Sequence, residues 1–517
     1  MNTSTKNRIV SLVRSPIVST ANAINNEATP CIAFAYLSSY ITNKGYKCNI
    51  VDSIAEGLGK IWTLRKYTNY VCQGLTFEET LDKIPLDTEV IGFSVMFSGE
   101  WPVVRDFINM ARKRFPGALF VAGGEHTTAL TEYTMKDCQA IDICVRGEGE
   151  ATFLSILDAY YENKPYDTVD ANFAYRDTSG QIILKSNSAR IKDVDSIPWP
   201  TWPEGYLEKF WEKGKSYGVQ TERDIPVMAS RGCPYKCTFC SNAVMWNARY
   251  MTRSVDDLLA EMKHYMDRYN ATGFQFYDLT AMTKKSWIIE FCNKLIDQKF
   301  NIKWSLPSGT RSEVLNSEVL GLLKKSGCNY LVYAPESGSE ESLIKIKKLI
   351  NKKRFTDSVL EAKKQGLVLR TNMIIGFPHE TRRDVFKTIR YGLYLAFKGV
   401  DEPSINIFSP YPGTEIFQNL INDNKIELND EYFLNLTSLN SDLFSLRHKN
   451  ANPFMGSREL AIYRTGFLLL NYAIGYIFFP SRIWRSIRNI FMGSNETATV
   501  FEHRLKDLIN REKFAGI

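Results

Sequence analysis

From about residue 225 onward, short apolar segments alternate with amphipathic stretches of helical length. The apolar segments begin near Ile225 and recur as far as Ile405, and each is followed by a stretch in which apolar residues have helical spacing. Because these segments are continuously apolar, they predict strands that are covered on both faces, as in a parallel sheet. Six such units within residues 225–425 predict an α/β fold with a parallel barrel of the TIM type.

A group of three cysteines follows the first of these strands. The segment from Arg231 to Cys240 (RGCPYKCTFC) spaces Cys233, Cys237 and Cys240 as C-x3-C-x2-C, whereas the other cysteines are scattered. The carboxyl end of a strand is where α/β folds place active sites. Zinc would need a fourth ligand, and the next histidine, His264, lies within a predicted helix. An iron–sulfur cube normally takes four cysteines, so three would leave one iron open for chemistry.

This segment resembles the signature of the radical S-adenosylmethionine (SAM) enzymes. The resemblance implies a [4Fe–4S] cluster held by Cys233, Cys237 and Cys240, with SAM chelating the open iron. Electron transfer from the cluster would cleave SAM to a 5′-deoxyadenosyl radical, which abstracts a substrate hydrogen. The resemblance also implies that the barrel is the incomplete (β/α)6 version. Phe239 would pack near the adenine, with a plain core position as the alternative.

Residues at the ends of later strands resemble the SAM contacts of the same family. Glu336 opens a Glu-Ser-Gly-Ser segment whose Glu reaches SAM in relatives, and Asp278 ends the second strand, where relatives carry an acidic residue. Arg311 follows the third strand and could pair with the methionine carboxylate. Gly376 lies in a turn whose backbone contacts adenine in relatives. The alternative for Glu336 and Arg311 is a solvated position on a loop.

Residues 1–160 show a second alternation of strands and helices. Strand-like segments near residues 8–13, 47–52, 90–96, 119–122 and 141–145 predict a doubly wound, flavodoxin-like domain of the Rossmann type. No G-x-G-x-x-G follows the first strand, so dinucleotide binding is not expected. Glycines at strand ends let a ligand approach the backbone closely. The residues at the later strand ends are Ser94, Gly123, Gly124, Gly147 and Glu148.

The segments VAGGEH (residues 121–126) and VRGEGE (residues 145–150) resemble the cobalamin (B12)-binding domain that precedes many radical SAM domains. The resemblance implies that Ser94 and the glycine pair surround a buried nucleotide tail. The Asp-x-His-x-x-Gly motif, which supplies an axial histidine in relatives, is absent, since the first 120 residues contain no His. We therefore expect His126 to be structural or to contact the tail. The alternative is a degenerate domain that has lost cobalamin.

The remaining segments complete the predicted domain organisation. Residues 161–224 predict a linker with a hairpin and a segment rich in Pro and Trp, and residues 426–517 predict a helical C-terminal extension. In the extension, the apolar run Gly466–Phe479 is followed by Arg482, Arg485 and Arg488. The run would span about 21 Å as a helix, short of the ~30 Å hydrocarbon core. It predicts either a helix packed on the barrel or peripheral membrane contact through residues 466–488.

Composition limits the possible partners and the location of the chain. The formal net charge of +7 is dilute over 517 residues, and no basic block dominates an element, so we expect no nucleic-acid binding. The first residues contain no apolar signal segment, which predicts a cytoplasmic protein. The membrane contact considered for residues 466–488 would then be with the inner membrane face. The resemblance adds an external one-electron reductant of the flavodoxin or ferredoxin type, and a small-molecule or lipid-like substrate.

The most common chemistry of this architecture implies methylation of an unactivated carbon, with cobalamin carrying the methyl group. The first alternative is radical oxidative cyclisation or rearrangement of a porphyrin, lipid or natural product. The alternative from another class is a non-catalytic cobalamin or redox sensor. The complete set of strand-end motifs favours an enzyme, because a sensor has no need of an open iron.

Overall fold

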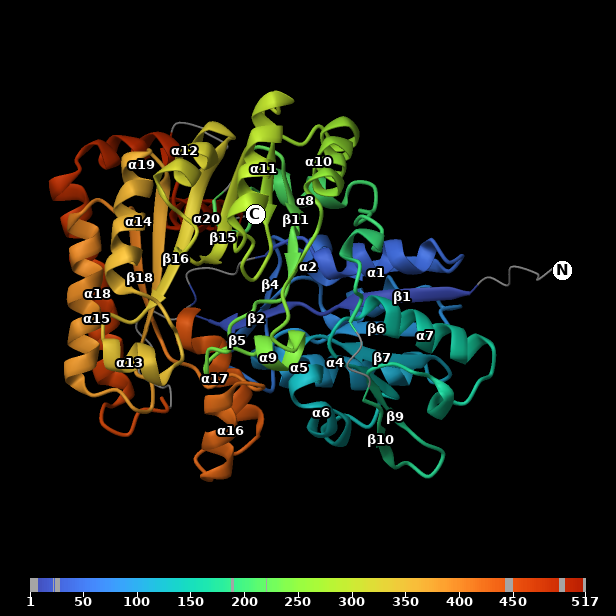
Figure 1. Ribbon diagram of the computed structural model, residues 1–517. Helices are drawn as coiled ribbons and strands as arrows, with labels where there is room; N and C mark the ends of the chain where they lie inside the picture. The colour runs from blue at the N-terminus through green and yellow to red at the C-terminus, as the bar shows by residue number, and fades with distance from the viewer. Residues whose placement is uncertain are drawn as a thin grey trace.

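A computed structural model describes residues 8–21, 23, 28–186, 190–219, 221–441, 450–491 and 498–514. Its two α/β domains stand side by side, with the N-terminal domain on the right and the barrel on the left of Figure 1. The C-terminal helices wrap the outer side of the barrel, and one of them also reaches the N-terminal domain. The cofactor motifs lie where the two domains meet.

The N-terminal domain is built on a seven-stranded sheet with the order β10-β9-β8-β7-β6-β1-β3. Its parallel strands are β1 (Ile9–Arg14), β3 (Lys47–Asp52), β6 (Val90–Ser94), β7 (Leu119–Gly123) and β8 (Ile143–Val145). Counted along the chain, these strands stand in the order 2-1-3-4-5, which is flavodoxin-like, as the sequence predicts. The covering helices are α1 (Ile32–Thr42), α4 (Trp101–Arg114), α5 (Glu125–Ala129), α6 (Thr131–Asp137) and α7 (Glu150–Tyr161).

The hairpin predicted in the linker forms β9 (Phe173–Arg176) and β10 (Ile182–Leu184). It adds to the N-terminal sheet, because β9 pairs antiparallel with β8. A small sheet that the sequence analysis did not predict contains β2 (Ile17–Thr20), β4 (Ile61–Thr63) and β5 (Tyr70–Gln73). The short helices around it and in the linker are α2 (Ser53–Glu56), α3 (Phe77–Asp82) and α8 (Tyr206–Glu212).

The barrel is an open sheet with the order β11-β14-β15-β16-β17-β18, and all neighbouring strands in it run parallel. The strands are β11 (Asp224–Val227), β14 (Gly273–Phe276), β15 (Lys303–Thr310), β16 (Cys328–Glu336), β17 (Val368–Ile375) and β18 (Glu402–Ile407). Every residue of β11 and β14 is buried, which explains why these strands carry so few polar residues. Among the described residues β11 and β18 do not pair, so the predicted incomplete barrel is confirmed.

The helices between the barrel strands bury one apolar face each. They are α10 (Val255–Tyr269), α11 (Lys285–Asp297), α12 (Ser317–Lys325), α13 (Glu340–Lys345), α14 (Lys352–Lys364) and α15 (Arg382–Phe397). Ser254 caps α10, since its side chain accepts from the N–H of Asp257. The Asp257 carboxylate bonds to Trp199 and Arg253, so it holds the linker and the cluster segment against this helix.

The C-terminal extension follows the short helix α16 (Glu415–Asn422) and consists of α17 (Asp430–Ser441), α18 (Ser457–Phe478), α19 (Ser481–Phe491) and α20 (Val500–Phe514). Helix α17 completes the core of the N-terminal domain, where Phe433 and Leu436 pack with Trp101. Helix α18 packs against α15 and β18.

Helix α18 contains the apolar run that the sequence singled out. At 22 residues it is longer than that run, and by length and composition alone it is long and apolar enough to cross a membrane, the one such helix among the described residues. One third of its most apolar window is buried in the protein. Two of the three arginines that follow the run bond to groups within the protein. Arg482 donates to the carbonyl of Gly399, and Arg485 pairs with Asp401 at 2.9 Å, because these buried groups need donors.

Candidate cofactor site between the two domains

The cysteine loop is held between two short strands, β12 (Ser230–Arg231) and β13 (Met251–Thr252), which pair antiparallel. Gly232 begins the loop with a φ of +78°, and a Cβ there would lie 2.0 Å from the Arg249 carbonyl oxygen, so only glycine fits. Within the loop, the Asn242 amide donates to the carbonyls of Cys233 (2.8 Å) and Tyr235 (3.0 Å). These contacts fix the path of the backbone that carries the thiols.

Cys233, Cys237 and Cys240 are free thiols of intermediate exposure, and they interact with one another electrostatically. Burial raises the pKa of all three, that of Cys240 to about 12. In the described part of the chain, no three His, Cys, Asp or Glu side chains are grouped so as to hold a single metal ion. Three thiols on one loop are nevertheless the donor set of a cluster in which each thiolate binds a different iron. The residues present therefore fit the predicted [4Fe–4S] cluster.

Positive side chains lie next to this loop. Lys348 is buried, and its Nζ lies 3.0 Å from Oε1 of Glu336. Lys348 lowers the pKa of Cys237 against the larger effect of burial, and Arg311 acts in the same direction. The Arg311 guanidinium lies 3.5 Å above the ring of Tyr235. Thiolates and their cluster are anionic, so these cations stabilise the loaded loop.

Arg311 and Glu336 have the geometry of binding residues. Nη2 of Arg311 donates to Glu313 and to the Leu349 carbonyl at 2.6 Å each, whereas its Nη1 is buried without a partner among the described residues. An unpartnered buried donor is costly, and a carboxylate ligand would satisfy it. Glu336 ends β16 with a φ of +64°, which is rare for a residue with a side chain. Such strain at a strand end is typical of functional positions.

Asp278, Phe239 and Gly376 are already engaged by the protein. Asp278 accepts from Ser230 Oγ (2.5 Å) and from the Ala229 N–H (3.1 Å), so it braces the start of the cysteine loop, and burial raises its pKa to about 6. The ring of Phe239 contacts that of Phe377 with centroids 5.7 Å apart. The N–H of Gly376 donates to a carboxylate, that of Glu380, at 2.7 Å. Contacts of these residues with SAM stay a prediction.

A cavity of about 340 Å³ lies between the N-terminal domain and the cysteine loop. The five residues predicted for cobalamin all line it: Ser94, Gly123, Gly124, Gly147 and Glu148. They converge because parallel strands end at one edge of the sheet, where Ser94 is the register partner of Gly123. At Gly124 the φ is +138°, and a Cβ would lie 2.4 Å from the Val95 carbonyl oxygen. Glycine at position 124 therefore lets the backbone segments after β6 and β7 pack closely together where they form the cavity wall.

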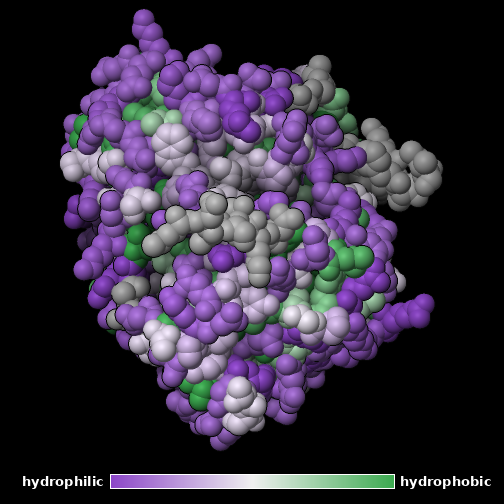
Figure 2. Space-filling view, turned by 90° about the vertical axis from the view of Figure 1, so that its right-hand side faces the viewer, coloured by the Kyte–Doolittle hydropathy of each residue, from purple (hydrophilic) through white to green (hydrophobic). Residues whose placement is uncertain are grey.

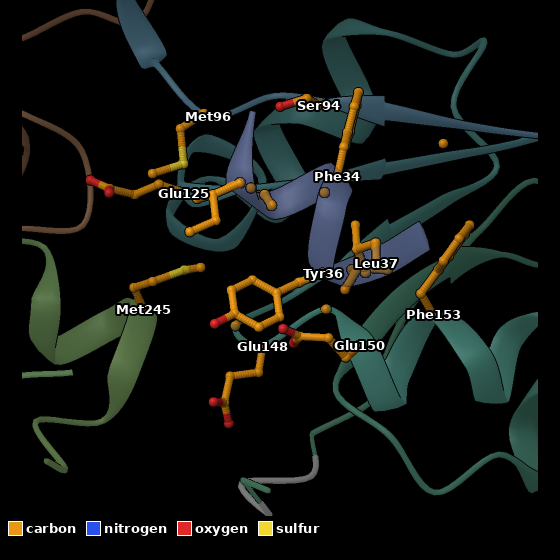
Figure 3. A pocket seen from close by; sticks show the side chains of 18 of the residues that line it. Phe34, Tyr36, Leu37, Ser94, Met96, Glu125, Glu148, Glu150, Phe153 and Met245 are labelled. Atoms are coloured by element: carbon orange, nitrogen blue, oxygen red, sulfur yellow. The ribbon is translucent and has the colours of Figure 1, made fainter. Parts of the chain in front are cut away.

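Most of the remaining cavity wall is apolar. Figure 3 shows Phe34 and Leu37 on α1, with Phe153 beside them and Met245 facing the cavity from the barrel side. Apolar walls with a few polar groups are typical of pockets for flat organic ligands. An apolar wall of this kind fits the dimethylbenzimidazole base of the cobalamin tail, and contact with it stays a prediction.

The barrel supplies part of this cavity, which the sequence analysis did not foresee. Residues from the barrel domain that line the cavity are Met228, Arg231, Gly232, Met245, Trp246, Tyr277 and Leu279. Two of them, Met228 and Tyr277, directly follow the strands β11 and β14, where a search of every strand end would have found them. Lys348 was also missed; the only signal was a pair of lysines shortly after the Glu-Ser-Gly-Ser segment.

A buried ion-pair network joins the cavity to the cysteine loop. Glu148 accepts from Arg190 at 3.0 and 3.2 Å and from Arg231 at 3.3 Å. Arg231 also donates to Glu150 at 2.5 Å. All four side chains are at least nine-tenths buried, and two cations balance two anions. Glu148, predicted to bind cobalamin, thus lines the cavity while both of its oxygens are engaged by arginines.

His126 does not face the cavity. Its ring stacks on Trp101 at 4.8 Å, meets the edge of Phe433 at 5.4 Å and bonds to Ser98 through Nδ1 at 2.9 Å. Burial lowers its pKa to about 3, so the ring stays neutral. His126 is therefore a core residue, one of the two roles expected for it.

Comparison with known proteins agrees with this arrangement. The family model of the B12 binding domain matches residues 26–157, and that of the Radical SAM superfamily matches residues 227–392. This chain is a B12-binding radical SAM enzyme. The cofactors of the enzyme are a [4Fe–4S] cluster, SAM and cobalamin.

The relatives of the enzyme include methyltransferases and cyclases. It is similar to an uncharacterized methyltransferase of Pyrococcus horikoshii, at 29% identity over 80% of this chain and 83% of the relative. It is also similar to an anaerobic magnesium-protoporphyrin IX monomethyl ester cyclase of Rubrivivax gelatinosus, at 24% identity over 77% and 67% of the two chains. Its fold resembles that of the radical SAM methyltransferase TsrM of Kitasatospora setae, solved with cobalamin and a [4Fe–4S] cluster (TM-score 0.64, 12% identity, 98% and 100% of the two chains).

Proposed function

We propose that the enzyme transfers a methyl group from SAM, by way of cobalamin, to an unactivated carbon of a small-molecule or lipid-like substrate. The observation that carries this proposal is the shared wall of the two cofactor sites. Arg231 and Gly232 line the B12 cavity, and Gly232 directly precedes the first cluster ligand, Cys233. Two cofactors held so close together can act on one substrate carbon in turn.

The chain's own residues would bind and orient the reactants. When bound, the cluster supplies the electron that cleaves SAM, and cobalamin carries the methyl group. Arg311, through its free Nη1, would hold the methionine carboxylate, and Glu336 would accept from the SAM ammonium or ribose. Lys348 would hold the Glu336 carboxylate in place, because the two are paired at 3.0 Å in a buried position. Ser94 and the glycines of the cavity would receive the nucleotide tail.

A second candidate function is oxidative cyclisation or rearrangement. Similarity to the magnesium-protoporphyrin cyclase favours it, since that similarity extends over 77% of this chain. The same cofactor sites would serve both reactions, so the products distinguish them. A non-catalytic sensor is a weaker candidate, because it would not need the unpartnered Arg311 donor beside the cluster loop.

The test is anaerobic reconstitution with iron, sulfide and cobalamin, followed by reduction with a flavodoxin or ferredoxin system. Methylation forms 5′-deoxyadenosine together with S-adenosylhomocysteine. Cyclisation or rearrangement forms 5′-deoxyadenosine alone. If neither product forms with a strong reductant and a panel of candidate substrates, the sensor is favoured and the proposal fails.

We also propose that the reaction takes place in the cytoplasm and that residues 466–488 bring the enzyme to a membrane surface. Support comes from the outward side of α18, where Leu469, Leu470 and Ile477 are exposed. Helix α18 is held to the barrel on its other side, since the Asn471 amide donates to the Pro403 carbonyl. This arrangement favours contact with a bilayer over crossing it.

A further inference from the structure

Helix α19 has its polar and apolar faces reversed. Its inward side carries Arg482, Arg485, Ser486 and Asn489, whereas its outward side carries Ile483, Trp484, Ile487 and Phe491. A helix on the surface of a water-soluble protein normally buries the apolar side instead. The burial of the polar side and the exposure of the apolar side of α19 each need an explanation.

The polar side of α19 faces inward because its side chains bond to buried carboxylates and carbonyl groups. Arg485 bonds to Asp401 (2.9 Å) and Glu502 (3.0 Å), and Ser486 and Asn489 each donate to Glu502 at 2.9 Å. These bonds fix the rotation of α19 about its axis. Trp484 is consequently held outward, with 74% of its surface exposed.

On the outward side, α19 continues an apolar surface that also covers α18 and α15. Figure 1 shows α18 standing beside α15 on the outer side of the barrel, with α19 turning across the end of α18. The rings of Phe397 and Phe478 join α15 to α18 at a centroid distance of 4.9 Å. The exposed apolar residues of this outer apolar face are Phe386, Tyr394, Phe397, Ile462, Leu469, Leu470, Ile477, Phe478, Ile483, Trp484, Ile487 and Phe491.

Such a surface marks an interaction site, because isolated exposed apolar residues are normal but a continuous patch is not. The opposite side of the molecule, shown in Figure 2, is mainly hydrophilic, and its apolar residues stand in separate groups.

Exposed cations border most of the outer apolar face, and at its Ile462 end Glu459 pairs with Arg382. Residues 385–398 and 466–491 contain no Asp or Glu, whereas Arg390, Lys398 and Arg488 are exposed there. A second copy of the chain seated on this face would bring like charges together, which is unfavourable. A surface of anionic lipid headgroups would attract the same cations, while apolar side chains and a Trp enter the headgroup boundary.

We infer that the outer apolar face binds the surface of an anionic bilayer, with α19 lying in the interface and no helix crossing it. The inference deepens the proposed membrane contact of residues 466–488 by naming the lipid charge and the binding helices. It also sets the orientation. Helix α19 bonds to Gly399 and Asp401, at the amino end of β18, whereas the cysteine loop lies at the carboxyl ends of the strands. Helix α19, the part that lies in the interface, would thus contact the membrane near the amino ends of the barrel strands, away from the cysteine loop.

The test is flotation of the reconstituted full-length enzyme with vesicles of phosphatidylcholine alone and with vesicles containing phosphatidylglycerol. We expect flotation with the anionic vesicles, weak flotation with neutral ones, and loss in 0.5 M salt. Trp484→Ser combined with Ile477→Ser should lower the floated fraction at least about tenfold. The matched control is Leu86→Ser in the N-terminal domain, where the side chain is also 74% exposed. Arg390→Glu with Arg488→Glu should weaken binding to anionic vesicles only.

Equal flotation with both kinds of vesicle would overturn the inferred lipid charge while leaving membrane contact in place. Absence of flotation, or dimers that disappear in the Trp484→Ser/Ile477→Ser variant, would overturn both. Unchanged flotation of that variant would overturn the assignment to α18 and α19. Formation of 5′-deoxyadenosine by the same proteins without vesicles tests the proposed methylation separately, because the substituted residues are remote from the cofactors.

Discussion

Arg231, two residues before the first cluster cysteine, donates to Glu150 at the start of α7 across 2.5 Å. The bond crosses from the radical SAM domain to the B12 domain in a buried position, and Glu148 and Arg190 complete the network. Removing one partner of a buried pair leaves an uncompensated charge, which costs more than the pair contributes. The network therefore makes the cysteine loop depend on the neighbouring domain.

Glu150→Gln should destabilise the enzyme by about 3 kcal/mol, because it leaves two buried arginines with one carboxylate. The measurement is urea unfolding, together with the amount of cobalamin retained after gel filtration. Glu132→Gln, which removes an exposed partner of Lys136, serves as the control and should change little. If Glu150→Gln is as stable as the control, the network has no structural role.

Cys237→Ala should abolish the visible absorbance of the cluster and all SAM cleavage, because a cluster bound by two thiolates does not persist. Cys48→Ala, a half-buried cysteine on β3, should leave both unchanged. Iron analysis and 5′-deoxyadenosine formation are the readouts. Retention of cluster and cleavage in Cys237→Ala would refute the ligand assignment.

Gly124→Ala should lower cobalamin binding while the cluster stays intact. The added Cβ would lie 2.4 Å from the Val95 carbonyl oxygen, at a φ of +138° that alanine disfavours. The loop that forms the cavity wall would have to shift. The ratio of cobalamin to iron after reconstitution measures the effect, and Gly117→Ala, where a Cβ meets open space, is the control. Equal ratios in the two variants would contradict the proposed cobalamin cavity.

Phe433→Ala should destabilise the N-terminal domain by about 3 kcal/mol, although the residue belongs to the C-terminal extension. Phe433 is fully buried against residues of the N-terminal core. Thermal unfolding would detect the change, and Phe454→Ala, at a residue that is 55% exposed, should have almost no effect. A similar small change in both would show that α17 docks weakly.

Glu380 gives the enzyme a dependence of stability on pH. Burial raises its pKa to about 7, so the folded state holds a proton that the unfolded state loses near its ordinary pKa of 4.5. Stability should therefore fall as pH rises from about 4.5 to 7, by up to about 3 kcal/mol, and level off above 7. Urea unfolding between pH 5.5 and 8 should show this slope in the wild type and a flatter profile in Glu380→Gln. Parallel profiles would mean that another group titrates.

The sequence predicted those parts of the molecule that depend on local pattern. The strand order of both sheets follows from mostly buried segments such as β16 and from the right-handed connections expected between parallel strands. The three cysteines were found because their spacing is short-range. The small sheet of β2, β4 and β5 was missed, because its strands are of at most four residues and depend on packing against Val103 and Leu434.

Contacts between distant residues could not be predicted in the same way. Arg482 and Arg485 follow an apolar run and so suggested a membrane-facing surface, but their partner Asp401 lies about eighty residues earlier. Lys348 reads as one of many surface lysines until Glu336 and Cys237 are seen beside it. In both cases burial of an acid selects the cation, and burial is a property of the folded chain.

Helix α17 touches both domains at once: Tyr432 donates to the Pro410 carbonyl of the barrel at 2.6 Å, and Asp430 pairs with Arg105 of the N-terminal domain at 2.9 Å. After completing the barrel, the chain thus returns across the boundary between the two domains, and α17 braces one domain against the other. Electron and group transfer both weaken steeply as the gap between donor and acceptor widens. By resisting a hinge motion between the domains, α17 would keep that distance constant from one turnover to the next.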